Sequence, residues 1–297
     1  MLGLQKKWLY LIILSIVWGS SFILIKKSLV GLTALQLGSL RTLFAAAFLL
    51  VLGFKHLKTI PKDKWKWIAI SAFLGTFIPA FCFAFAETEI DSAVVSVLNS
   101  TVPIIALLLG VFIFGIGFTR NQLIGVIVGL VGSLLLIWSG ATLNPNQNYW
   151  YSLLVIGASF CYGMNVNIIK KHLQDISALG IAVGNFIVLV IPAFIVLAFS
   201  GFFEQDILAN DDVMTSLGYL VILAIVGTGV AKVLFNKLVQ ISTPVFATSV
   251  TYMIPIVALF WGLLDGEQFG FSQIGAACLI IFGVYLANRK SPKKTPI

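Results

Sequence analysis

The sequence predicts an all-α membrane protein whose ten transmembrane helices form two inverted five-helix repeats. Composition, ten long apolar runs and an internal repeat predict this fold. Of the 297 residues, 59% are hydrophobic and only 10% are charged, whereas soluble domains carry about 25% charged residues. The formal charge of +8 comes from lysines at the ends of apolar runs, not from a basic face with interleaved aromatic residues. We therefore expect membrane lipid around the chain and no nucleic-acid partner.

Ten apolar runs are long enough to cross a hydrocarbon core of about 30 Å, which takes about 20 helical residues. A β-barrel would show alternating segments of about ten residues, and these runs are continuous. Helices satisfy their own backbone hydrogen bonds in lipid, so the runs predict a helical bundle. The first run is too long for a secretory signal. The predicted spans are 8–27, 33–54, 66–86, 92–115, 119–139, 150–170, 177–200, 215–237, 243–264 and 271–288.

The placement of lysine and arginine predicts the orientation, because cytoplasmic connections hold the excess of these residues. With the N-terminus inside, fifteen of the 19 lysines and arginines lie on the inner side, which puts both termini in the cytoplasm. Lys26 and Lys27 are the two cations on the outer side, and Arg41 and Lys232 fall inside spans. The outer pair either snorkels to the headgroups or serves the outer mouth of a pathway.

The two halves of the chain repeat each other. The stretch "WGSSFILIKK" at 18–27 returns as "YGMNVNIIKK" at 162–171, which is 144 positions later. Near the end of each half the offset becomes 152, where "SVLNSTVPIIALLLG" at 96–110 aligns with "TSVTYMIPIVALFWG" at 248–262. Each half holds five helices, and this odd number inserts the second copy upside down, as in many secondary transporters. We expect the two repeats at 1–140 and 150–290, followed by a basic cytoplasmic tail at 291–297.

These segments, together with the closing "GEQFGFSQIGAACLIIFGVYLA", resemble the EamA type of the drug/metabolite transporter superfamily over essentially the whole chain. The resemblance implies a ten-helix carrier of the bacterial inner membrane that exports amino acids or related small metabolites. It also implies that helices one, three, four, six, eight and nine surround the substrate path, while five and ten brace the outside. One departure is Gly115, where the second half has Glu267. We expect Glu267 to cap the outer membrane edge.

Polar residues inside the spans recur at matched positions of the two halves. A polar side chain without a partner is costly in lipid, so these residues should face the bundle interior or a wet cavity. The alternatives are helix-to-helix hydrogen bonds of about 0.6 to 2 kcal/mol each, an interfacial anchor for the tryptophan and packing bends for the prolines. The predicted substrate-binding residues are Trp18, Ser21, Ser96, Asn99, Tyr162, Asn165, Thr228, Lys232, Asn236, Thr248, Thr251 and Tyr252, and Pro103 and Pro255 are predicted to shape their helices.

Lys232 is the strongest candidate for substrate binding, because it shares a face of helix eight with Thr228 and Asn236. A charge at mid-span costs about 2.5 to 3.5 kcal/mol on insertion scales, so another group must offset it. One hypothesis is that Lys232 meets a substrate carboxylate or takes part in a proton step. The other is that its long stem snorkels to the cytoplasmic face. For Arg41, whose counterpart Asn185 is uncharged, the sequence favours a structural tie to neighbouring groups.

The sequence leaves two interpretations open for an acidic residue in helix three and two for a row of glycines in helix five. Glu87 at the outer end of helix three is a candidate proton carrier, although acids at an outer rim are usually solvated. Gly125, Gly129 and Gly132 form a close-packing face on helix five. This face serves either a contact within the chain or the seam of a homodimer.

The sequence argues against an enzyme and predicts no cofactor. The two histidines, His56 and His172, lie in connections, and neither HExxH nor GxSxG occurs. The absence of GxxxxGK[ST] argues against direct use of ATP, and three cysteines within spans make no disulfide or metal framework. We therefore expect a secondary transporter with a small-molecule substrate, working by alternating access. A lipid scramblase or a channel-like facilitator built on the same bundle is the alternative.

Overall fold

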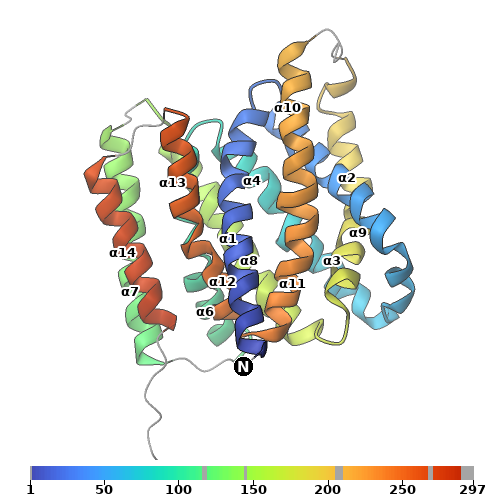
Figure 1. Ribbon diagram of the computed structural model, residues 1–297, viewed down its shortest axis with the longest axis horizontal. Helices are drawn as coiled ribbons and strands as arrows, with labels where there is room; N and C mark the ends of the chain where they lie inside the picture. The colour runs from blue at the N-terminus through green and yellow to red at the C-terminus, as the bar shows by residue number, and fades with distance from the viewer. Residues whose placement is uncertain (1, 116–118, 144–145, 205–209, 267–269, 289–297) are drawn as a thin grey trace, which may run out of the picture.

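The protein is all-helical in every part that the structure describes. The computed structural model describes residues 2–115, 119–143, 146–204, 210–266 and 270–288. Its helices stand side by side in one bundle (Figure 1). This confirms the fold class that the apolar runs and the repeat predict. The predicted tail at 291–297 and Glu267 lie outside the described residues.

Each predicted span becomes one helix or a series of shorter helical segments. The first half holds α1 (Leu2–Ser28), α2 (Ala34–Gly53), α3 (Trp65–Ala72), α4 (Ile78–Ala86), α5 (Ser92–Asn99), α6 (Val102–Phe112) and α7 (Arg120–Leu143). The second half holds α8 (Ser152–His172), α9 (Ala178–Ala198), α10 (Asp211–Ile222), α11 (Ala231–Ile241), α12 (Pro244–Thr248), α13 (Ile254–Leu264) and α14 (Phe271–Asn288). Short 3₁₀ segments cover Phe54–Thr59, Lys62–Lys64, Tyr149–Tyr151, Phe202–Glu204 and Ser249–Tyr252.

Eight of the ten predicted spans are long and apolar enough, within the described residues, to cross a membrane. The fifth and tenth spans form α7 and α14, whose described apolar stretches are shorter, at Leu123–Gly132 and Phe271–Gly283. These two helices stand together at one edge of the bundle, and α2, α3 and α9 form the opposite edge (Figure 1). The remaining helices enclose the centre.

Matched residues start matched helices in the two halves. The Thr33 hydroxyl accepts a hydrogen bond from the backbone N–H of Gln36 at the start of α2, and the Gln36 side chain bonds back to Thr33. At the repeat position, the Ser177 hydroxyl accepts from the N–H of Gly180 at the start of α9. Such caps satisfy backbone donors that the first helical turn leaves unpaired. The repeat thus fixes where the second and seventh spans begin.

Glycines bring α7 and α14 into backbone contact. A Cβ atom built on Gly283 would lie 2.5 Å from the backbone nitrogen of Gly129 and 2.7 Å from the carbonyl oxygen of Gly125. One built on Gly132 would lie 2.7 Å from the side chain of Ile280. The glycine face of helix five therefore serves a contact within the chain, as small residues do between membrane helices.

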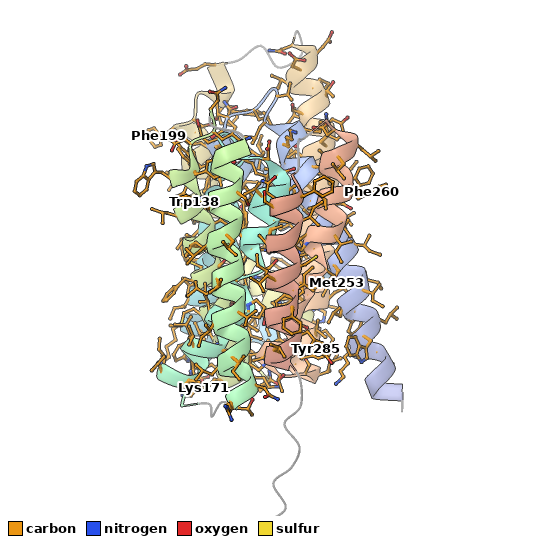
Figure 2. The ribbon with its side chains drawn as sticks, turned by 90° about the vertical axis from the view of Figure 1, so that its left-hand side faces the viewer. Trp138, Lys171, Phe199, Met253, Phe260 and Tyr285 are labelled. Carbon is orange, nitrogen blue, oxygen red and sulfur yellow. The ribbon has the colours of Figure 1, made fainter. Side chains whose placement is uncertain are left out.

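The outer surface of the bundle suits lipid. Figure 2 shows large apolar side chains standing out from α7, α13 and α14, among them Trp138 and Phe260. Trp138 is 76% exposed and Phe260 58%. A soluble monomer rarely exposes so many large apolar groups together, whereas lipid tails solvate them. The composition and this surface agree on a membrane protein.

The fourth and ninth spans are interrupted, where the sequence predicted continuous helices. Helix α5 ends at Asn99 and α6 starts again at Val102, while a 3₁₀ segment separates α12 from α13. In both spans the proline, Pro103 or Pro255, stands in the first turn of the second segment. Proline has no N–H to bond the preceding turn, and it disfavours helical geometry at the residue before it. The matched prolines therefore accompany breaks in their helices.

The two breaks touch each other at the centre of the bundle. The Ser100 hydroxyl in the first break donates to the carbonyl oxygen of Thr251 in the second, at 3.1 Å. Ser100 is fully buried, so this bond joins the two halves in the core. Interrupted helices that meet at the interface of two repeats are how many transporters build a central site.

Candidate substrate cavity

A cavity of about 90 Å³ lies where the two halves meet, beside the two helix breaks. Residues of helices one, three, four, six, eight and nine line it, together with two residues of α2, Arg41 and Thr42. The other lining residues are Trp18, Ser21, Phe22, Ile25, Gly75, Thr76, Ala80, Phe83, Asn99, Val102, Tyr162, Asn165, Gly227, Thr228, Lys232, Phe235, Thr248, Val250, Thr251 and Ile254.

Most of this lining consists of repeat partners. At the offsets of 144 and 152, sixteen described lining residues form eight pairs, so the cavity lies on the axis that relates the two halves. One example is aromatic. Trp18 packs against Phe235 with ring centroids 5.1 Å apart, and their repeat partners Tyr162 and Phe83 stack at 6.0 Å. The two aromatic pairs form opposite, equivalent walls.

A second pair of partners, Gly75 and Gly227, lies in π-helical turns at Phe73–Phe77 and Leu223–Val230. Such turns are frequent at functional sites. A Cβ atom on Gly75 would meet the amide of Asn165 at 2.4 Å, and one on Gly227 would meet the hydroxyl of Ser21 at 2.7 Å. Asn165 and Ser21 are themselves repeat partners. Both glycines therefore let helices one and six approach the π-helical turns.

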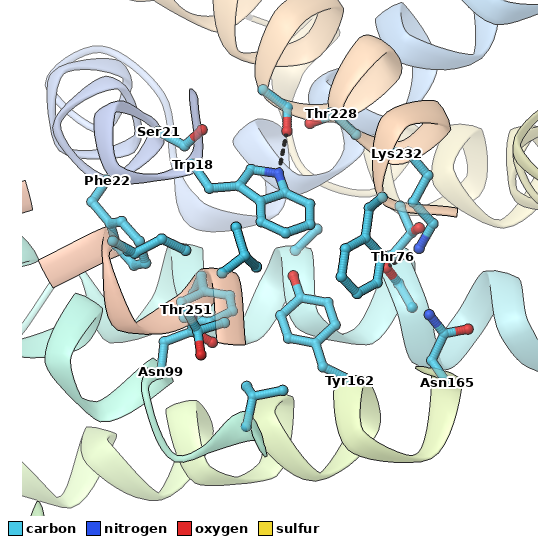
Figure 3. Close-up of a pocket in the computed structure, with 18 of the residues that line it drawn as sticks. Trp18, Ser21, Phe22, Thr76, Asn99, Tyr162, Asn165, Thr228, Lys232 and Thr251 are labelled. Atoms are coloured by element: carbon cyan, nitrogen blue, oxygen red, sulfur yellow. Dashed lines mark hydrogen bonds between the residues drawn. The ribbon is translucent and has the colours of Figure 1, made fainter. Parts of the chain in front are cut away.

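The carbonyl groups of these glycines bond side chains from elsewhere in the bundle. The indole nitrogen of Trp18 donates to the carbonyl oxygen of Gly227 at 3.0 Å, the bond dashed in Figure 3. The Lys232 ammonium donates to the carbonyl oxygen of Gly75 at 2.5 Å. Four residues after Gly75 stands Pro79, which has no N–H to bond that carbonyl in α-helical register. Sequence reasoning left Pro79 unassigned, although a proline in a span signals a free carbonyl one turn earlier.

Lys232 is buried, with 6% of its surface exposed. Its ammonium is bound at Gly75 inside the bundle, so the side chain does not snorkel to the membrane face. The bond crosses from the second half of the chain to the first. Figure 3 shows the ammonium group beside Thr76 and Asn165.

Arg41 is a lining residue that sequence reasoning treated as a structural tie. It does make such a tie, because its Nε donates to the hydroxyl of Thr228 at 2.7 Å. Yet the side chain also faces the cavity and is only half-buried. The depth of Arg41 within its span was the sequence feature that could have indicated a lining residue. Comparison with its uncharged repeat partner Asn185 gave no support for that role. Asn185 lies on α9, which contributes no described residue to the lining.

Two buried polar atoms at the cavity have no hydrogen-bond partner among the described residues. They are the hydroxyl of Thr76 and the side-chain oxygen of Asn99. Thr76 is 7% exposed and Asn99 is 5% exposed. A buried polar group without a partner costs about 1 to 3 kcal/mol, so these atoms suit a bound ligand.

The structure brings nine of the twelve predicted binding residues to the cavity and places three outside its lining. Ser96 bonds the carbonyl of Ala93 in its own helix at 2.6 Å, and Asn236 donates to the carbonyl of Ala178 at 3.3 Å, which ties α11 to α9. Tyr252 is buried beside the break in the ninth span. Of these three residues, Asn236 makes the helix-to-helix bond that the alternative describes, and Ser96 bonds within its own helix. Pro103 and Pro255 also lie outside the lining.

Ion pairs join the two halves near the end of the bundle that the sequence predicts to face outward. Lys26 and Lys27, at the end of α1, both pair with Asp265, which follows α13; the Lys26 nitrogen lies 2.8 Å from a carboxylate oxygen. Burial raises the pKa of the Asp265 carboxyl, but the hydrogen bonds from the two lysines outweigh it and hold this pKa below its ordinary value. The two lysines therefore have a local counter-ion. Nearby Glu87 is buried, unlike the solvated rim acid that was expected.

Another ion pair joins the halves at the opposite end. The Lys64 ammonium lies 3.0 Å from a carboxylate oxygen of Asp175 and also donates to the carbonyl of His172 at 2.9 Å. The bond from Lys64 lowers the pKa of the Asp175 carboxyl. Beside it, the rings of Trp67 and His172 stack at 3.7 Å. Ion pairs thus join the two halves toward both ends of the bundle.

A comparison with family models matches residues 5–138 and 149–289 to the EamA-like transporter family, one match in each half. The chain belongs to the EamA-like transporter family. The family is one of transporters, so this protein is not an enzyme, and it carries a small-molecule substrate across a membrane that it spans several times. These matches confirm the resemblance found in the sequence.

Relatives match this EamA-like transporter over nearly all of their length. It is 26% identical to the "Uncharacterized inner membrane transporter YedA" of Escherichia coli (strain K12), over 93% of this chain and 88% of that protein. It is 25% identical to a "Probable amino-acid metabolite efflux pump" of Salmonella typhimurium, over 91% of both chains. A protein of known crystal structure aligns with a TM-score of 0.70 over 96% of both chains, at 15% identity. This last likeness shows the fold alone.

Proposed function

We propose that this EamA-like transporter exports amino acids or related small metabolites across a bacterial inner membrane by alternating access, with both termini in the cytoplasm. The observation that carries the proposal is the cavity between the halves, which is lined by repeat partners and beside which both helix breaks meet. Two halves that pack around one shared site can open it to either side in turn. The relatives named as an inner membrane transporter and as an amino-acid metabolite efflux pump support the membrane and the substrate class.

The cavity also supports a small solute over a lipid. Its volume of about 90 Å³ is below the about 300 to 1,000 Å³ of pockets that enclose drug-sized ligands. Ion pairs join the two halves outside its lining. A lipid scramblase needs a path that is open to the bilayer along its length, and a channel needs a continuous pore. A compact cavity between two matched halves favours a carrier over both.

Counterflow in proteoliposomes tests this proposal. Vesicles loaded with unlabelled amino acids, one at a time, should accumulate the labelled compound with saturable kinetics. Repeating the measurement with an imposed proton gradient separates proton coupling from facilitated diffusion. Vesicles with a fluorescent phospholipid report scrambling in parallel. Lipid scrambling without saturable solute exchange, or flux that does not saturate, would favour the alternative of a scramblase or channel.

The predicted binding residues enter the proposal by their position. We place the substrate between the aromatic walls of Trp18 and Tyr162, in reach of Asn99, Asn165 and Lys232. The further contacts proposed are Ser21, Thr228, Thr248 and Thr251 from the sequence, with Arg41 and Thr76 added from the geometry. The glycine face of helix five is taken up by α14, so a homodimer needs another surface.

A further inference from the structure

One end of the cavity presents hydrogen-bond donors. The hydroxyl of Ser71 donates to the side-chain oxygen of Asn165 at 2.6 Å, which leaves the amide nitrogen of Asn165 for the cavity. The carbonyl of Gly75 is taken by Lys232. The hydroxyl of Thr76 is buried and has no partner among the described residues. The side-chain oxygen of Asn165 and the carbonyl of Gly75 are occupied, which leaves the amide nitrogen of Asn165 as a donor and the hydroxyl of Thr76 as a group that can donate or accept.

The same end carries positive charge. Lys232 and Arg41 both line the cavity. Arg41 bonds Thr228, which stands four residues before Lys232 in the same span. Within the described residues, neither cation makes a salt bridge. Glu87 is close enough to interact with the charge of Arg41, but it does not line the cavity. By formal charge, the two basic side chains and the one acid leave an excess of one positive charge at this end.

The repeat shows that these charges are particular to the site. At the repeat positions of Lys232 and Arg41 stand Ala80 and Asn185. The aromatic walls and the glycine turns obey the symmetry of the halves, and the two cations break it. A charge in a membrane span is costly, so two unmatched cations at one cavity indicate an anionic occupant.

An α-amino acid fits this end poorly. Its ammonium group is attached to the carbon that bears the carboxylate, so a carboxylate at Lys232 would bring the ammonium among donors and cations. An unpartnered amide oxygen, that of Asn99, lies with Thr251 across the rings of Trp18 and Tyr162 (Figure 3). Those rings provide an apolar surface for the middle of a ligand. A donor group reaches Asn99 only from the far end of the molecule.

We propose that the cavity takes an organic monoanion, namely a carboxylate on an apolar or aromatic body with no ammonium group beside it. Lys232 and Arg41 hold the carboxylate, and Trp18 and Tyr162 flank the body. This inference rests on the proposed function, because it identifies the substrate class of the same site. It narrows "amino acids or related metabolites" to their deaminated acids.

Three compounds that share one ring and differ in charge test the inference. These are 3-phenylpropionate, phenylalanine and phenethylamine, which are an anion, a zwitterion and a cation. Equilibrium binding to the purified full-length protein is measured by quenching of tryptophan fluorescence and by the shift in melting temperature. The anion should bind at least about tenfold more tightly than the zwitterion, with the cation weakest. Equal or tighter binding of phenylalanine or phenethylamine, or no binding of the anion at millimolar concentration, would overturn the inference.

Variants locate the binding. Lys232→Gln and Arg41→Gln should each weaken binding of 3-phenylpropionate about tenfold or more and reduce its advantage over phenylalanine. Lys237→Gln is the matched control, because Lys237 is exposed on the same helix α11; it should change neither. An anion preference that survives in both cavity variants overturns the assignment to these cations. If a variant fails to fold, the ligand series on the unmodified protein decides alone.

The anion-site proposal and the transporter proposal can be refuted independently of each other. Saturable counterflow of amino acids without binding of the carboxylate would leave the transporter proposal intact and refute the anion site. Binding of the carboxylate without counterflow of any compound would leave the anion site intact and refute transport by alternating access.

Discussion

Replacing Gly75 by alanine tests the centre of the cavity without removing any side chain that contacts substrate. The added Cβ atom would lie 2.4 Å from the amide nitrogen of Asn165 and 2.6 Å from the ammonium of Lys232. Ordinary van der Waals contacts begin near 3.4 Å, so both groups must retreat by most of an ångström. Both are the ends of flexible side chains and not backbone. The helix therefore keeps its fold while the cavity loses its polar arrangement.

The magnitude follows from the bond that is lost. Lys232 bonds the carbonyl of Gly75 at 2.5 Å, and a hydrogen bond to a charged group contributes about 1.5 to 3 kcal/mol. Transport by Gly75→Ala should therefore show a KM raised about ten- to a hundredfold. Stability should fall by about 0.5 to 2 kcal/mol, because alanine favours a helix over glycine by about 1 kcal/mol and so offsets only part of the lost bond.

Two other glycines provide the comparison. Gly157→Ala on α8 adds a Cβ with no atom within 4 Å, so it should leave KM unchanged. Gly227→Ala, at the repeat position, displaces the hydroxyl of Ser21. That hydroxyl carries no charge and makes a neutral bond to Val17, so KM should rise by about two- to tenfold.

Counterflow in proteoliposomes gives KM and turnover for each variant, and thermal melting of the purified protein reports its stability. A Gly75→Ala protein that melts normally and transports with an unchanged KM would refute the reasoning. It would mean that Lys232 and Asn165 do not hold the substrate.

Three further predictions concern the aromatic wall, the predicted outer end and the helix pair at the edge. Trp18→Phe removes an indole donor and should raise KM about two- to tenfold, whereas Trp138→Phe on the lipid-facing surface should leave it unchanged. Asp265→Asn removes the counter-ion of two lysines, and exposed pairs contribute about 0.2 to 1 kcal/mol each. Labelling of a cysteine introduced at the cavity, from the predicted outer side, should therefore rise about two- to tenfold. The lowered pKa of this carboxyl keeps it ionised at every pH above its ordinary value of 3.8. With Asp265 unchanged, the labelling rate of the introduced cysteine should therefore rise on acidification only as the pH falls below that value. Gly283→Ala must push α14 away from backbone atoms of α7 and should cost about 1 to 3 kcal/mol, while Gly275→Ala, with nothing within 4 Å, should melt like the unmodified protein.

The spans and the repeat could be predicted from the sequence because each leaves a direct trace in it. A run of about 20 apolar residues is a local property, and the return of "WGSSFILIKK" as "YGMNVNIIKK" needs only comparison of the chain with itself. The matched caps Thr33 and Ser177 follow from the same repeat. The interruptions of the fourth and ninth spans were harder to predict from the sequence. A proline indicates a bend, but the hydrogen bonds around it decide whether the helix breaks. At Ser100 the partner that stabilises the break is 151 residues away in sequence.

The role of Arg41 shows why repeat logic is incomplete. Comparison of the halves pairs Arg41 with Asn185. It identifies a site residue only where both halves carry a similar side chain at the matched position. The cavity is lined by α2 but by no described residue of its repeat partner α9, so the symmetry does not extend to these helices. The contact that brings Arg41 to the cavity is with Thr228, on the other half. No periodicity within α2 indicates which helix of the second half lies against it.

Symmetry and its violation have different roles in this cavity. The paired glycines and aromatic walls give the two halves equivalent surfaces. Alternating access between an inward-open and an outward-open conformation, related by the two-fold axis of the repeats, requires such equivalence. A ligand bound only by such groups would have no preferred orientation about the axis. The unmatched charges of Lys232 and Arg41 remove that degeneracy, because they attract one end of an anion to the π-helical turns of helices three and eight. The charged end should then stay with these turns while the aromatic walls rearrange around the rest of the molecule.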